Sequence, residues 1–166
     1  YDVEPVRVIR NGVDTEEFKP MPHENGRPVV IYASDAPPKG GDVGAALGQE
    51  AAAIAAGDVY LCPSRYEGNS YAALQALACG LPIVTSCTGL FAEMMDDTLD
   101  GYALGARVAE VSTAPAAIEE WDTALSAVVE DRREMGAEAR GWAEQHGTVQ
   151  RWAREWRDLI ESYTRE

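Results

Sequence analysis

The segment from Asp58 to Ser86 constrains the fold most strongly, because it contains a strand, a loop, a helix and a second strand in close succession. Its first seven residues form a short apolar strand that a proline stops. A polar loop leads to Asn69 or Ser70, either of which suits the N-cap of a helix running to about Cys79, with Gly80 as its C-cap. The last four residues form the next strand. Such a unit is typical of a parallel sheet, in which ligands bind where strands end and helices begin.

The rest of the first two thirds of the chain continues this alternation. Residues 29–33 are an apolar run with β-branched side chains, as in a strand covered on both faces. Residues 35–41, rich in Pro and Gly, predict a loop, the alanine-rich residues 45–56 predict a helix, and residues 101–104 predict a further short strand. We therefore expect residues 1–166 to form a single α/β domain with a parallel sheet flanked by helices.

The C-terminal third is expected to be helical. A proline suits the first turn of a helix from Pro115 to about Glu130, and two more helices are expected at residues 133–145 and 148–163. On the last of these, apolar side chains recur at spacings of three or four residues, and we interpret their face as a packing surface: Val149, Trp152, Trp156, Leu159 and Ile160.

Composition excludes several classes of function. The net charge of -14 and the lack of a basic patch argue against nucleic acid as a partner. No apolar run approaches the roughly 18–20 residues that span a bilayer, so no transmembrane segment is predicted. The two histidines lie far apart, which disfavours a histidine metal site or a Ser–His–Asp triad.

The three cysteines lie among apolar residues and predict buried thiols in a reducing, cytoplasmic compartment: Cys62, Cys79 and Cys87.

The loop and helix at the centre of the segment combine three kinds of polar group. Glu67 lies just before the helix, and Gly68, Asn69 and Ser70 present backbone N–H groups at the positive end of its dipole. Gln75 is the polar exception on an otherwise apolar helix, and a buried amide without a partner costs about 1–3 kcal/mol. Its partner is either the protein backbone or a ligand. The pattern predicts a site for phosphate with hydroxyl groups near the carboxylate and the amide.

Several motifs, in matching order over most of the chain, resemble those of one enzyme family. The runs from Pro63 to Gly68 and from Ala76 to Val84 resemble the signature of the family 4 (group 1) retaining glycosyltransferases of the GT-B fold. That signature has two glutamates separated by seven residues. Further similar positions are Arg10-Asn11-Gly12-Val13-Asp14, Phe18, Pro20, Lys39-Gly40, Thr88-Gly89, Glu93 and Gly101.

The resemblance implies a Rossmann-like, C-terminal donor-binding domain whose N-terminal acceptor domain is absent. The intact enzyme would transfer a sugar from a nucleoside-diphosphate sugar to an unknown acceptor with retention of configuration, without a metal or other cofactor. Glu67 would contact the donor sugar as the catalytic residue, and Gln75 would contact the ribose. Lys39 and the main chain of the three residues after Glu67 would hold the diphosphate. We expect the isolated chain to be inactive or nearly so.

Three departures from the family pattern qualify this expectation. Gln75 stands where the family has its second glutamate, an arginine expected shortly before Lys39 is absent, and the segment between Ala33 and Asp58 is short. These departures favour an alternative in which the chain is a degenerate nucleotide-binding or scaffold domain. An unrelated flavodoxin-like domain lacks support, because neither an Asp triplet at strand ends nor a Gly-rich first turn is present.

Overall fold

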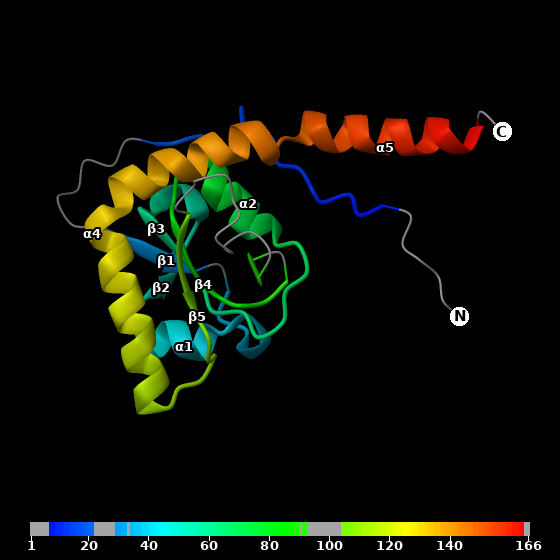
Figure 1. Cartoon of the computed structure of the whole chain (residues 1–166). Helices are drawn as coiled ribbons and strands as arrows, with labels where there is room; N and C mark the ends of the chain where they lie inside the picture. The colour runs from blue at the N-terminus through cyan, green and yellow to red at the C-terminus, as the bar shows by residue number, and fades with distance from the viewer. Residues whose placement is uncertain (1–6, 22–28, 33, 90, 93–103, 165–166) are drawn as a thin grey trace, which may run out of the picture.

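The computed structural model describes residues 7–21, 29–32, 34–89, 91–92 and 104–164. Its centre is a five-stranded sheet in the order β2-β1-β3-β4-β5, in which every neighbouring pair is parallel (Figure 1). The strands are β1 (Val30–Tyr32), β2 (Glu50–Ala51), β3 (Val59–Cys62), β4 (Ile83–Ser86) and β5 (Gly105–Val108). The predicted α/β class with a parallel sheet is confirmed.

Helices flank the sheet and form the C-terminal third of the chain. The α-helices are α1 (Gly41–Ala46), α2 (Tyr71–Ala78), α4 (Pro115–His146) and α5 (Val149–Thr164), and the 3-10 helices are η1 (Pro37–Lys39) and η2 (Ile54–Ala56). No helix among the described residues is long and apolar enough to cross a bilayer.

The sheet is covered on both faces, which explains why its strands are almost wholly apolar. Side chains alternate along β3, so that Val59 and Leu61 enter one hydrophobic cluster and Tyr60 and Cys62 enter the other. The first cluster lies under the first half of α4. The second lies between the sheet, α2 and the second half of α4, where Trp142 is buried.

The central unit folds as its residues predict. The strands β3 and β4 fall within the expected ranges, and Ser70 is the N-cap of α2. The helix ends at Ala78, and Gly80 adopts a φ of 74°, a left-handed conformation that favours glycine after a helix.

The predicted helix over residues 45–56 is wrong. The helix α1 starts earlier and ends at Ala46, and Gly48 then turns the chain with a φ of 68°. Residues 50–51 pair with β1 as an edge strand. Helix propensity is a weak preference, and strand pairing outweighs the high propensity of alanine in so short a segment. The predicted loop over residues 35–41 holds η1 and the first residue of α1.

Two boundaries in the C-terminal half also differ from expectation. The strand expected at residues 101–104 is observed as β5, one residue beyond that range, and residues 101–103 lie outside the described part. The break expected between two helices near residue 131 is wrong, because α4 is continuous. No glycine or proline interrupts it there, and burial on both sides of this point extends the helix across both clusters.

The interpretation of the apolar face of α5 as a packing surface is wrong for the described chain. Of the five side chains on this face, Val149, Trp152 and Leu159 are half-buried, Trp156 and Ile160 are 42% and 58% exposed, and none is fully buried. The helix extends beyond the domain (Figure 1) and is held at its start, where Arg151 donates hydrogen bonds to the carbonyls of Arg10 and Asn11. The described chain therefore covers this face only in part, and leaves Trp156 and Ile160 exposed.

The predicted burial of the cysteines is confirmed for two of the three residues. Cys62 and Cys79 are buried, whereas Cys87 is exposed in the loop just after β4, and all three are free thiols. Cys87 follows the last residue of β4 and is next to Ser86 and Thr88, so the strand does not bury it.

Candidate functional site

A pocket of about 240 Å³ lies at the carboxyl ends of β1 and β3. Of the predicted site residues, Lys39, Glu67 and Ser70 line it. Its other lining residues come from β1, β3, the loops that follow them and the first turn of α2: Tyr32, Ser34, Tyr60, Leu61, Cys62, Pro63, Ser64, Tyr71 and Ala72. The structure therefore brings together residues that are far apart in the sequence, at the sheet edge predicted for a ligand.

Lys39 and Glu67 form an ion pair at this pocket. The Nζ atom of Lys39 lies 2.6 Å and 3.0 Å from the two carboxylate oxygens of Glu67. The side chain of Glu67 is only 9% exposed, whereas that of Lys39 is 47% exposed. A nearly buried carboxylate requires a compensating charge, and Lys39 supplies it from the solvent side.

The turn that carries Lys39 is attached to the loop after β3. Arg65 donates hydrogen bonds of 2.7 Å and 2.8 Å to the carboxylate of Asp42 and a further one to the carbonyl of Pro37. The hydrogen bond from Arg65 lowers the pKa of Asp42 below its usual value. Gly40 has a φ of 74° and lies against the carbonyl of Pro63, where a side chain would not fit. These contacts fix the position of the backbone at Lys39, from which its side chain reaches the pocket.

The N-terminus of α2 lies beside the ion pair. Ser70 is buried, and its hydroxyl accepts a hydrogen bond from the N–H of Ala73 at 3.4 Å, so this serine caps the helix. The side chain of Asn11 donates to the carbonyl of Asn69, and the Oδ1 atom of Asn69 is buried without a donor among the described residues. Gly68 is exposed, with open space where a side chain would be.

Gln75 does not line the pocket. It lies one turn beyond Tyr71 on the less buried side of α2, and its side chain makes no hydrogen bond to a described residue. A core glutamine bonded to backbone is therefore not what the structure shows. The amide remains available to a ligand that extends along the helix from the pocket.

A model of the group 1 glycosyl transferases matches residues 41–131, which is more than half of the chain. The chain belongs to this family. The prediction from the central motifs is thereby confirmed at the level of the family. No curated protein is significantly similar to the chain in sequence.

Solved glycosyltransferase structures share the fold of this chain. Sucrose-phosphate synthase from Thermosynechococcus elongatus superimposes with a TM-score of 0.74 at 17% identity, over 95% of this chain and 52% of that one. Anabaena HepE in complex with UDP gives a TM-score of 0.72 at 17% identity, over 94% and 57% of the two chains. A glycosyltransferase from Rickettsia africae gives 0.71 at 11% identity, over 94% and 56%. The fold is that of GT-B glycosyltransferases, and the chain spans about half the length of these proteins.

Two positions in this group 1 chain join the later motif to the pocket. The hydroxyl of Thr88 donates to the carbonyl of Ser64 at 3.4 Å. Gly89 has a φ of 54° and lies against the carbonyls of Glu67 and Gly68. The loop after β4 therefore supports the loop that carries Glu67. Glu93 and Gly101, the remaining motif positions, lie outside the described residues, as does Ala33.

Sequence reasoning missed the inner wall of the pocket. Tyr60 and Cys62 point from β3 toward α2, and burial raises the pKa of both side chains, so both are uncharged at neutral pH. The phenol of Tyr32 donates to the carboxylate of Asp35 at 2.7 Å. The alternation of β3 side chains could have identified Tyr60 and Cys62, because both lie on the face that α2 covers.

Carboxylates and histidines do not gather into a metal site in the described part of the chain. No group of three or more His, Cys, Asp or Glu side chains is placed there to hold an ion. The cationic group at the pocket is instead Lys39.

Proposed function

We propose that this chain is the donor-binding half of a retaining glycosyltransferase that uses a nucleoside-diphosphate sugar. The observation that carries the proposal is the Lys39–Glu67 ion pair, which lies at the pocket beside the N-terminus of α2 in a member of the group 1 glycosyl transferases. A cation and a helix N-terminus suit a diphosphate, and a carboxylate can accept hydrogen bonds from sugar hydroxyls.

The ion pair suggests how the donor enters. The diphosphate competes with Glu67 for Lys39, whose exposed ammonium group can turn toward the phosphates. Glu67 then loses its compensating charge and accepts hydrogen bonds from sugar hydroxyls instead. During transfer the leaving nucleoside diphosphate gains negative charge, which Lys39 and the helix N-terminus stabilise.

The first turn of α2 supplies further donors. The N–H groups at the start of a helix lack intrahelical partners, and at this helix the Ser70 hydroxyl meets only the one at Ala73. The other first-turn N–H groups are left to bind phosphate oxygens, with Gly68 offering an open approach. The ribose of the nucleotide would extend along α2 toward Gln75.

The structural neighbours suggest the first donor to test. HepE structures contain UDP, UDP-glucose, or UDP with glucose. We therefore choose UDP-glucose as the first probe, with GDP- and ADP-sugars as alternatives.

The acceptor side is assigned to the rest of the enzyme. The chain spans 52% of the length of sucrose-phosphate synthase, and Trp156 and Ile160 on the apolar face of α5 are exposed in the described chain. We propose that the N-terminal acceptor domain covers this face and completes the cleft. The isolated chain would then bind the donor without transferring sugar, and no metal or other cofactor would take part.

The proposal is tested by titrating the chain with UDP-glucose and with UDP. We expect saturable binding and a raised melting temperature, because a ligand that binds only the native state stabilises it. Lys39→Gln should weaken binding at least tenfold. Lys19→Gln, at an exposed lysine outside the pocket, removes the same charge and should leave affinity unchanged. The melting temperature of each variant without ligand separates lost affinity from lost stability.

A degenerate scaffold domain is the alternative, and the position of Gln75 outside the pocket favours it. That alternative predicts no thermal shift with UDP-, GDP- or ADP-sugars. Sugar transfer by the isolated chain would contradict the assignment of the acceptor side to a second domain.

A further inference from the structure

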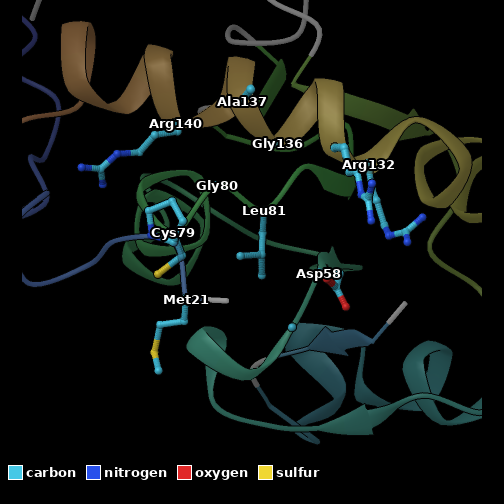
Figure 2. Close-up of a pocket in the computed structure, with 12 residues that line it drawn as sticks. Met21, Asp58, Cys79, Gly80, Leu81, Arg132, Gly136, Ala137 and Arg140 are labelled. Atoms are coloured by element: carbon cyan, nitrogen blue, oxygen red, sulfur yellow. The ribbon is translucent and has the colours of Figure 1, made fainter. Parts of the chain in front are cut away.

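A second and larger pocket lies at the opposite edge of the sheet. Its volume is about 500 Å³, and its lining includes Asp58, just before β3, and Leu81, just before β4 (Figure 2). The other wall is one face of α4 between Arg132 and Arg140. None of the residues that line it belongs to the predicted donor site.

Three arginines on this face of α4 give the pocket a positive wall in a chain whose net charge is -14. One of the three is structural. Arg140 donates hydrogen bonds to the carbonyls of Thr15, Phe18 and Ala78, and also pairs with Glu144. Its guanidinium is therefore occupied by the protein.

The other two arginines keep unused donors. Arg132 gives one hydrogen bond, to the carbonyl of Val129 at 2.8 Å, and no described residue accepts one from the rest of its guanidinium. Arg133 is exposed and donates to no described residue. Asp58 is the carboxylate in the lining, but it accepts a hydrogen bond from the N–H of Val29 at 2.8 Å and makes no ion pair with either arginine.

The floor of the pocket is apolar and close-packed. Leu81, labelled in Figure 2, lines the pocket and is itself buried in the core. Gly136 brings α4 against the carbonyl of Gly80, at a distance that leaves no room for a side chain. Cys79 is buried beside them, and burial raises the pKa of its thiol, so the floor carries no charge at neutral pH.

We propose that this pocket binds a small organic phosphate monoester. Guanidinium groups match phosphate oxygens in pairs of hydrogen bonds, and the two charges of Arg132 and Arg133 balance a phosphate dianion. The organic part lies on the apolar floor around Leu81. The volume is within the range of about 300–1,000 Å³ that small-molecule sites occupy. This site is independent of the donor pocket, and its ligand is bound rather than transformed.

The experiment titrates the full chain with inorganic phosphate and with phenyl phosphate at low ionic strength, followed by calorimetry. We expect one saturable site and tighter binding of phenyl phosphate, because its ring adds apolar contact with the floor. Arg132→Gln combined with Arg133→Gln should weaken phenyl phosphate binding at least tenfold. The matched control is Arg154→Gln combined with Arg157→Gln, at exposed positions of α5, and should stay within twofold of the parent.

Ala137→Glu provides a second variant in which both arginines remain. This exposed residue lines the pocket, so a carboxylate there should also weaken binding at least tenfold, whereas Ala127→Glu on the same helix should not. Melting temperatures confirm that each variant is folded.

The Lys39→Gln variant distinguishes this pocket from the donor site, which also contains an anion-binding helix N-terminus. Binding of phenyl phosphate that is kept in Lys39→Gln and lost in the arginine pair supports the inference, whatever the outcome for UDP-glucose. Binding lost in Lys39→Gln and kept in the arginine pair overturns it. Absence of saturable binding in the parent chain, or equal affinity in the arginine pair and its control, overturns it as well.

Discussion

The two pockets lie at opposite ends of the strands, which we call the carboxyl edge and the amino edge of the sheet. Their charged side chains are arranged differently. At the carboxyl edge Lys39 is paired with Glu67 and Arg65 with Asp42, so the smaller pocket has its charges balanced by the protein. At the amino edge the larger pocket has two arginines, Arg132 and Arg133, whose guanidinium groups keep N–H donors without an acceptor among the described residues. The larger of these two pockets is therefore not the one that the family motifs indicate.

The difference between the pockets matters for binding, because a charge that is already paired within the protein and a charge that is unpaired respond differently to a ligand. A ligand at the carboxyl edge must exchange with an existing ion pair, which makes binding selective for a group that can replace both partners. A ligand at the amino edge only adds to unused donors, and general anion binding follows more easily there. We therefore expect binding at the proposed donor site to depend on both the diphosphate and the sugar, and binding at the amino edge to depend on the phosphate charge together with apolar contact.

The largest expected effect tests how rigidly the carboxyl edge is held. Gly40→Ala places a side chain at a φ of 74° against the carbonyl of Pro63. The backbone conformation costs about 1–2 kcal/mol and the overlap about 1–3 kcal/mol, so the free energy of unfolding should fall by about 2–5 kcal/mol. Urea unfolding at neutral pH measures it.

Gly48→Ala is the matched control for this substitution. Gly48 has a similar φ of 68°, with open space where the side chain would be. Only the backbone conformation is penalised, and the loss should be about 1–2 kcal/mol. Equal losses in the two variants would mean that the Lys39 turn yields readily, and that the carboxyl edge is no more rigid than an open loop.

A smaller effect sharpens the assignment of the carboxyl edge to nucleotide binding. Gln75→Glu introduces the charge that the family pattern has at this position. Hydrogen bonds to a charged acceptor are stronger than those to a neutral one, so UDP affinity should rise about fivefold, or about 1 kcal/mol. Calorimetric titration measures this, with Gln150→Glu on the exposed side of α5 as control. Unchanged affinity in Gln75→Glu would remove this residue from the nucleotide site.

The sequence predicts the carboxyl edge far better than the amino edge, and the reason is locality. Glu67, Ser70 and the helix they precede lie within one strand–helix–strand unit, where caps and periodicity operate over a few residues. The pocket at the amino edge is assembled from Met21, Leu81 and Arg133, which no local pattern connects. Lys39 is predicted as a site residue only from the family motif. No local pattern in the sequence predicts its contact with Glu67.

The two mistaken elements differ in cause. The helix expected at residues 45–56 gives way to an edge strand, because pairing with β1 outweighs local helix preference. The break expected in α4 is absent, because no glycine or proline interrupts the helix there and residues on both sides of that point are buried. Periodicity predicts the apolar face of α5, but periodicity alone does not specify what covers it. Propensity indicates which elements are possible, and packing decides where they end.

The smallest effect concerns the ion pair that holds the Lys39 turn. Arg65 lowers the pKa of Asp42 from its usual 3.8, so the pair stabilises the folded state above that pH and loses this contribution as the pH falls through the lower, folded-state pKa. The side chain of Asp42 is 38% exposed, so solvent screening limits the contribution to about 0.5–1 kcal/mol. Asp42→Asn should therefore destabilise the chain by this amount at pH 7 and by progressively less below pH 3.8. Urea unfolding of the parent and the variant at pH 7 and at a pH below 3.8 measures the difference. A destabilisation that persists at the lower pH would assign the effect to the hydrogen-bond geometry rather than to the charge of Asp42.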